Sequence, residues 1–456
     1  MHHGLAMGAD HAGPVSRAVL RTSPMLVQQT GSRAIFGGVF VAFLSRGCDA
    51  DPEGCVGIEG AAVWDAPPDR RLCVLDDRVV EGRTPGELDV LERVEEVAGS
   101  LVIHDNPTLK QLPAWPALVR IGGSLSISAN AELGTVQGFP VLTELGRGLY
   151  VAENPKLAAF ELGGALTAAG SVFFALNPRL TRVAGLASLE QVERDVYFGD
   201  NAALEVVEML ALAEMGGDLQ VKNNLSLRDA NFTSLRSVAG IWSVSHNPAL
   251  VSLSGFSALE RAWQVSIDDN AALTDVAWTT AFEVVTSITI VDNERLERIS
   301  GGPVVHLAPT TQVNIARNPA LNEIVGFTGV VSLDGLTIEE NLALLAVSGW
   351  SGLTRLTGRG LTIARNPALT GPGGWFAGLV NASDFAVFGN ASLEPMTVDA
   401  LLAHVAVEGA TRVGDNKGES TLLDPCPWPR DGICDAASGP YGPGTALCLL
   451  DWEDCA

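Results

Sequence analysis

A short alternation of apolar and polar residues returns about every 24 residues through most of the chain. In residues 124–128, Leu125 and Ile127 alternate with three serines, the period-two pattern of a strand with one buried face. An asparagine follows each such segment, and a leucine stands three residues beyond it in thirteen of fourteen copies. A repeat of this length predicts a solenoid. The asparagines are Asn106, Asn130, Asn154, Asn177, Asn201, Asn224, Asn247, Asn270, Asn293, Asn318, Asn341, Asn366, Asn390 and Asn416.

The repeated asparagine is predicted to be structural. Its amide can bond to the N–H and C=O groups of the turn and to the asparagine one coil further on. A turn that is stacked in register cannot leave its buried backbone groups unpaired. We therefore do not expect the asparagines to bind a ligand or to catalyse a reaction.

After the last leucine of the repeat, the pattern changes to a helical one. Residues 396–409 carry apolar residues at helical spacing, and Thr397 is a suitable N-cap. Terminal repeats need a cover for their exposed core. We expect a short helix that caps the last coil.

The charge balance limits the class of partner. The 456 residues include 53 acids and 29 bases, which gives a net charge of -24. A phosphate backbone would be repelled by this charge, so a nucleic-acid partner is not expected.

The N-terminal segment has the features of an export signal. Arg33 precedes the apolar run 34–44, which is too short to span a membrane, and Gly47 and Cys48 follow. This arrangement resembles a bacterial lipoprotein signal, which implies lipid on Cys48. The prediction is export to the bacterial outer membrane or cell surface, with membrane contact only through that lipid; secretion is the alternative. Residues 1–47 would be the signal, with Met25 as a later start, and residues 48–72 a linker.

The seven cysteines flank the repeats and none lies within them. If Cys48 carries lipid, six remain, enough for a Cys55–Cys73 bridge and two C-terminal bridges. The alternatives are that Cys48 is removed with the signal or pairs with Cys55.

The phrases GSLVIHDNPTL, GSLSISANAEL and GLTIARNPALT resemble the receptor L domain, a leucine-rich-repeat-like family of growth-factor receptor ectodomains and fungal cell-wall proteins. Cys73 and residues 79–82 resemble its first segment. The likeness covers residues 73–416 and implies an all-β fold: a right-handed β-solenoid of about 14 coils, with non-catalytic binding or display as its function. The expected divisions are the solenoid at 73–395, the capping helix and last coil at 396–420, and a cysteine-rich tail at 421–456.

The tail carries four cysteines beside several acids, which predicts a disulfide-held loop. Its Gly432–Asp435 and Cys448–Cys455 segments resemble the Notch-type calcium-binding repeat. The resemblance implies the bridges Cys426–Cys448 and Cys434–Cys455. It also implies a Ca²⁺ site, since calcium prefers oxygen ligands, and the candidate carboxylates are Asp431, Asp435, Asp451 and Asp454. The alternative is a small disulfide knot whose acids are solvated. Zinc is disfavoured, because the segment has no histidine and oxidised cysteine cannot ligate.

Three aromatic residues stand at the same outward position in successive coils. Tyr150, Phe173 and Tyr197 each lie four residues before the repeat asparagine. Stacked in register, they would form an outward strip that binds a sugar ring or an apolar anchor of a protein. The alternative is a cross-strand ladder that only stabilises the sheet.

The position just before the asparagine is often acidic. Asp269 and Asp292 are one coil apart, and carboxylates at about 5 Å are the arrangement of retaining glycosidases. Acids scattered along a turn are more typical of a solvated edge, and no basic cluster accompanies these two in the sequence. The hypothesis is an exported binding or display protein, not an enzyme, whose ligand is a protein or a glycan. A structural envelope spacer is the second hypothesis, and a polysaccharide-active enzyme is a distant third.

Overall fold

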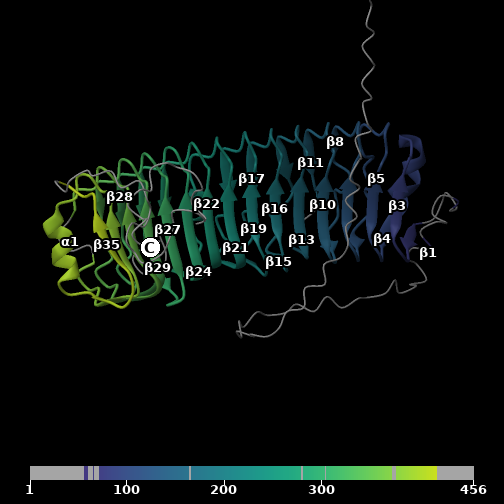
Figure 1. The fold of residues 1–456 in the computed structure, drawn as a ribbon. Helices are drawn as coiled ribbons and strands as arrows, with labels where there is room; N and C mark the ends of the chain where they lie inside the picture. Colours follow the sequence, from purple (N-terminus) through teal and green to yellow (C-terminus); the bar gives the residue numbers. More distant parts are fainter. Residues whose placement is uncertain are drawn as a thin grey trace, which may run out of the picture. The chain divides into compact units, whose positions relative to one another are not determined.

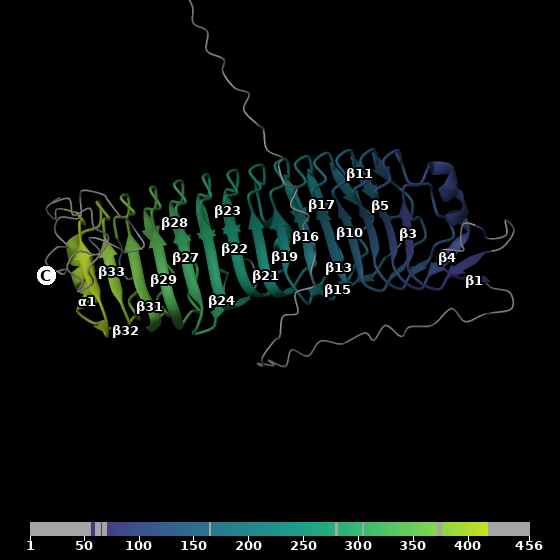
Figure 2. The same ribbon diagram turned by 45° about the vertical axis from the view of Figure 1, so that its right-hand side comes forward.

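The computed structural model describes residues 56–59, 65, 71–163, 166–278, 281–302, 305–371 and 376–417. Nearly all regular structure there is short parallel strand, arranged in successive coils (Figures 1 and 2). The predicted all-β solenoid of about 14 coils is confirmed. Within these residues, no helix has the length and apolar character needed to cross a membrane.

The longest sheet is built from the strands that precede each repeat asparagine, and we call it the asparagine sheet. Neighbouring strands pair in parallel and in register, and they lie side by side along the stack (Figures 1 and 2). Its strands are β3 (Arg78–Glu81), β5 (Leu101–His104), β7 (Leu125–Ser128), β10 (Gly148–Ala152), β13 (Ser171–Ala175), β16 (Val196–Gly199), β19 (Leu219–Lys222), β21 (Ser237–Ser245), β22 (Arg261–Asp268), β24 (Phe282–Val291), β27 (Gln312–Ala316), β29 (Ser332–Glu339), β31 (Arg355–Ala364), β33 (Phe385–Phe388) and β35 (Thr411–Gly414).

Two further sets of parallel strands complete the coils. One set follows the asparagine turn: β8 (Thr135–Val136), β11 (Ala159–Glu161), β14 (Arg182–Ala184), β17 (Val206–Glu208), β20 (Asp229–Asn231), β23 (Asp275–Ala277), β25 (Arg298–Ser300), β28 (Glu323–Val325) and β30 (Ala346–Val347). The other precedes the asparagine strand: β1 (Val56–Ile58), β2 (Leu72–Val74), β4 (Val94–Val97), β6 (Arg120–Ile121), β9 (Glu144–Leu145), β12 (Ala168–Ala169), β15 (Gln191–Val192), β18 (Glu214–Met215), β26 (Val305–Leu307), β32 (Asn381–Ala382) and β34 (Ala406–Val407).

One large apolar core runs through the described coils, from Leu72 to Val405, and Ala364, Ala386 and Phe388 form a small separate cluster. Inward positions repeat from coil to coil, so like side chains stack along the core. Phe174 and Phe198, for example, lie parallel with ring centroids 5.3 Å apart. This stacking explains the strict spacing of aliphatic and aromatic residues, because one displaced residue would turn its side chain to the other face of the strand.

The asparagines form a continuous hydrogen-bonded column in the interior, as predicted. The Oδ1 of Asn154 accepts the backbone N–H of Asn130 at 3.1 Å and its Nδ2 at 3.1 Å. The Nδ2 of Asn130 also donates to the carbonyl oxygens of Ile103 and Ser128. The Oδ1-to-backbone bond recurs between all neighbouring asparagines up to Asn416, and none of the fourteen side chains is more than 3% exposed. We call this set the asparagine column.

The residue before each asparagine adopts a left-handed backbone conformation in every coil. Its φ lies between 51° and 67° at all fourteen positions, which only Gly, Asn and Asp adopt readily. The sequence did not reveal this feature, because Ala129, Leu176 and Arg317 are among its members. We call this set the αL column: Asp105, Ala129, Glu153, Leu176, Asp200, Asn223, His246, Asp269, Asp292, Arg317, Glu340, Arg365, Gly389 and Asp415.

The N-terminal end of the stack differs from the repeat. Strand β3 belongs to an additional coil in which Arg83 occupies the asparagine position, and its backbone N–H donates to the Oδ1 of Asn106 at 2.9 Å. Arg78 points inward where later coils have apolar residues. Its burial, together with nearby Arg83, lowers its pKa to about 10, so it stays charged near neutral pH. The 3-10 helix η2 (Pro85–Arg93) follows this turn.

The C-terminal end carries the predicted helix, α1 (Pro395–Leu402), which packs Val398 against the core (Figure 1). The predicted N-cap, Thr397, is wrong. Glu394 occupies the cap position and Pro395 begins the helix, because proline fits the first helical turn without losing a hydrogen bond. A second short 3-10 helix, η3 (Ser254–Phe256), lies within the repeats.

Candidate functional site

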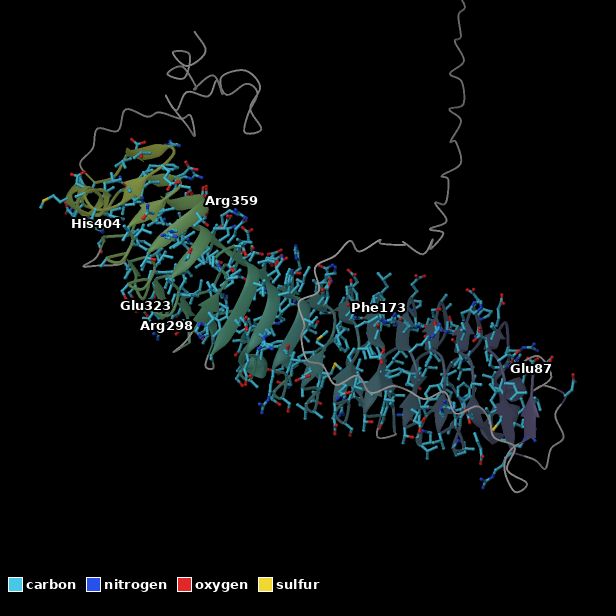
Figure 3. The ribbon with its side chains drawn as sticks, turned by 90° about the horizontal axis from the view of Figure 1, so that it is seen from below. Glu87, Phe173, Arg298, Glu323, Arg359 and His404 are labelled. Atoms are coloured by element: carbon cyan, nitrogen blue, oxygen red, sulfur yellow. The ribbon has the colours of Figure 1, made fainter. Side chains whose placement is uncertain are left out.

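The three predicted aromatic residues lie together on the outer face of the asparagine sheet. Tyr150 pairs in register with Phe173, and Phe173 with Tyr197. The ring centroids of Phe173 and Tyr197 are 4.6 Å apart and nearly parallel, while Tyr150 is tilted at 6.3 Å from Phe173. Figure 3 shows Phe173 among the side chains that project from the sheet. We call these residues the aromatic strip.

Tyr197 has little free ring face. Phe173 covers one face of Tyr197, and the Nζ of Lys222 lies 5.0 Å from the centroid of the same ring. A Cβ at Gly148 would come within 2.4 Å of the Tyr150 ring, and one at Gly199 within 2.3 Å of the Tyr197 hydroxyl oxygen. The two glycines therefore make room for rings that lie close over the sheet. At the Tyr197 end, the strip therefore offers ring edges and a hydroxyl group instead of an open stacking surface.

Polar and apolar neighbours border the strip. The hydroxyl of Tyr197 lies 3.5 Å from the Oδ2 of Asp200, and burial together with this carboxylate raises the pKa of Tyr197. Leu176 follows β13 and is 51% exposed. Glu153 and Asp200 stand on either side of Leu176 in the αL column. Leu176 therefore presents an exposed apolar surface between the carboxylates of Glu153 and Asp200.

A groove of about 670 Å³ lies farther along the same face. His246, Asp268, Asp269, Asp292 and Arg317 line it together with the hydroxyls of Ser266 and Thr289. His246 Nε2 is 3.3 Å from an oxygen of Asp269, and its Nδ1 is 3.6 Å from an oxygen of Asp268. The groove concentrates charged residues of the αL column.

The two acids that the sequence suggested as a pair have different partners. Asp292 accepts two hydrogen bonds from Arg317, each 2.7 Å long, whereas Asp269 faces His246. The bidentate contact raises the pKa of Arg317 and occupies both oxygens of Asp292. Sequence reasoning missed Arg317. The repeat itself could have revealed it, since Arg317 and Asp292 occupy the same position in successive coils.

A second histidine stands between two carboxylates near the start of the stack. His104 Nδ1 is 2.9 Å from an oxygen of Asp105, and His104 Nε2 is 3.8 Å from an oxygen of Glu81. One ligand atom from each of the three residues lies within 4.8 Å of the others. This cluster was also missed from the sequence, because Glu81 belongs to the coil that lacks the repeat asparagine.

Several predicted sites lie outside the described residues. They are Cys48, Cys55 and the tail residues Asp431, Asp435, Asp451, Asp454, Cys426, Cys434, Cys448 and Cys455. Cys73 is buried on β2. The lipid, the calcium site and the three cysteine pairings therefore stay predictions.

Comparisons with known proteins add little to this picture. No protein-family model matches the chain, and no curated protein matches it. One solved structure, a crystal structure of a TLR13–ssRNA13 complex, is similar at 13% sequence identity over 78% of this chain and 75% of that chain. Its TM-score is 0.16, so the likeness carries no argument.

Proposed function

We propose that this chain is a non-catalytic binding scaffold and that the aromatic strip with Leu176 anchors a protein ligand. The observation that carries the proposal is a run of three neighbouring aromatic rings at an outward register position where most other coils carry small or polar residues. Val79 and Val102 are the apolar exceptions, in the first two coils. Ser126 stands beside Tyr150 in register, and Gln220 beside Tyr197. Aromatic anchors beside polar residues are typical of protein interfaces.

The geometry favours a protein over a glycan. A sugar ring stacks on an open aromatic face, whereas the faces of Tyr197 are covered by Phe173 and Lys222. A protein side chain can pack against ring edges and against Leu176. Because Glu153 and Asp200 flank Leu176, we expect the partner to carry basic residues around its apolar anchor.

The resemblance to receptor L domains supports binding or display. The lipoprotein-like N-terminus supports export and attachment through Cys48, with a Ca²⁺ site in the tail as a further part of the proposal. A polysaccharide-active enzyme is less well supported, because both oxygens of Asp292 are engaged by Arg317.

The test compares two immobilised variants with the parent chain. In the first, Tyr150, Phe173 and Tyr197 are all changed to Ser, the residue at the same register position in Ser126 and Ser243. In the control, Val331, which is exposed just before β29, is changed to Ser. Each is incubated with a cell-surface protein extract and with a glycan array.

The proposal predicts one protein that the parent and the Val331→Ser control retain and the triple variant loses. Glycan binding lost in the triple variant would assign the strip to a sugar instead. Equal retention by all three chains, or none by any, would leave the strip as a stabilising ladder and favour the spacer hypothesis.

A further inference from the structure

We propose that Glu81, His104 and Asp105 bind one divalent transition-metal ion, with Zn²⁺ the best match. The site lies outside the aromatic strip and does not depend on the function proposed above. Glu81 ends β3 and His104 ends β5, and the two residues pair in register. Asp105 follows directly in the αL column. The site therefore joins the first two coils of the asparagine sheet.

The three ligand atoms are close enough to converge on one ion. They lie within 4.8 Å of one another. A tetrahedral site with bonds of about 2.1 Å has ligand atoms roughly 3.4 Å apart. The difference is small, and the side chains of Glu81 and Asp105 are 62% and 63% exposed, so they can rotate toward the ion. The histidine ring is the less exposed member and supplies a fixed point.

The local charge also favours a cation. Within the described residues, the ion pairs of Glu81 and Asp105 both run to His104. Two carboxylates around a single imidazole leave an excess of negative charge. Farther along the αL column, two of the carboxylates have arginine partners: Asp292 pairs with Arg317, and Glu340 with Arg365. Those acids are already neutralised, whereas the pair around His104 is not.

The donor set selects among metals. Imidazole nitrogen with carboxylate oxygen suits Zn²⁺, Ni²⁺ and Cu²⁺, whereas Ca²⁺ and Mg²⁺ prefer oxygen alone. Three protein ligands would leave a fourth position for water. Bound here, the ion would cross-link β3 to β5, the strand with which β3 pairs among the described residues.

The full chain is first treated with a chelator to remove bound metal. Zn²⁺ is then titrated into it, and isothermal calorimetry measures the heat of binding. We compare the parent with His104→Gln, which removes the imidazole, and with Asp105→Asn, which keeps a residue that favours the left-handed backbone. The matched control is His246→Gln. His246 also lies between two carboxylates, Asp268 and Asp269, but these three do not gather within the same distance.

The proposal predicts that His104→Gln loses one equivalent of bound Zn²⁺. It predicts that Asp105→Asn binds this equivalent about tenfold more weakly or worse, since even indirect metal partners contribute 10–100-fold. His246→Gln should bind as the parent does. Circular dichroism of each variant checks that the fold is intact.

Three results would overturn the proposal. The parent could bind no Zn²⁺ beyond what His104→Gln binds. The control could lose the same equivalent as His104→Gln, which would make the effect general to surface histidines. Ca²⁺ could bind the parent and His104→Gln equally and compete with Zn²⁺, which would show that the carboxylates alone hold the ion.

Discussion

The asparagine column and the αL column are adjacent in the sequence but tolerate different residues. The asparagine column contains one residue type in fourteen coils, whereas the αL column contains acids, bases, leucine, alanine and glycine. Each asparagine satisfies buried backbone groups in its own coil and in its neighbours. The αL residue shares only a backbone conformation from coil to coil, and its side chain lies at the outer edge, where its contacts differ between coils. Hydrogen bonding therefore fixes residue identity more strictly than backbone strain does.

The largest expected effect comes from removing one member of the asparagine column. Asn224→Ala leaves the buried N–H of Asn201 without its acceptor and frees the carbonyl oxygens of Phe198 and Lys222. Several unsatisfied buried groups should lower the free energy of unfolding by about 3–5 kcal/mol. Urea denaturation measures this loss. Asn223→Gly in the αL column is the control and should change the free energy of unfolding by less than about 1 kcal/mol. Equal losses in the two variants would show that the asparagine column is no less tolerant of substitution than the αL column.

The next effect has the opposite sign. Leu176 has a φ of 56°, which costs an ordinary L-residue roughly 1–2 kcal/mol, whereas asparagine tolerates this conformation. Leu176→Asn should therefore raise the free energy of unfolding by about 1 kcal/mol while it removes part of the proposed binding surface. Leu225→Asn is the control, because Leu225 is also exposed but lacks a positive φ. A gain at Leu225 as large as at Leu176 would mean that lost apolar exposure, not relieved strain, is responsible.

A smaller effect concerns the ion pairs of the αL column. Asp292 and Arg317 are both about half exposed, so their coupling should be only about 0.5–1 kcal/mol despite the bidentate geometry. A double-mutant cycle with Asp292→Asn and Arg317→Gln measures it, and 0.5 M salt should reduce it. The same cycle with Asp269→Asn should give almost no coupling to Arg317. Stronger coupling between Asp269 and Arg317 than between Asp292 and Arg317 would contradict the partners described above.

The interior of this molecule could be predicted from the sequence, and the outer edge could not. Leu125, Ile127 and Asn130 recur at fixed spacing because each must match the coil above and below, so their burial is visible as a pattern. The left-handed conformation at Leu176 and Arg317 could not be predicted from the sequence, because neither residue type favours it. The first coil was included in the predicted solenoid through the resemblance of Cys73 and residues 79–82 alone, because Arg83 replaces the asparagine that marks the others.

The site residues show the same limit. The register of Tyr150, Phe173 and Tyr197 followed from the repeat, so their proximity was predictable. The way the rings stack depends on side-chain torsions and on Gly148 and Gly199, and the spacing of the repeat does not contain that information.

The smallest expected effect lies where the asparagine column begins. At Arg83 no asparagine is present, and a charged group holds the turn instead: Glu87 accepts hydrogen bonds from the Thr84 backbone N–H at 2.9 Å, from the Thr84 hydroxyl at 2.8 Å and from Arg83 at 3.0 Å. These bonds lower the pKa of Glu87 from 4.5 to about 2. Glu87 lies at the N-terminal end of the stack (Figure 3).

Because the folded-state pKa of Glu87 is lowered, its stabilising contribution is complete above about pH 4.5 and disappears as the pH falls toward 2. An amide column does not titrate, so this turn should loosen in acid before the coils that carry asparagine. Carbon-13 NMR titration of the Glu87 carboxyl measures the pKa directly. Glu87→Gln should make the amide signals of residues 84–93 insensitive to pH between 4.5 and 2. An ordinary pKa for Glu87 would show that the turn is held without it, and that the first coil does not depend on charge where the others depend on asparagine.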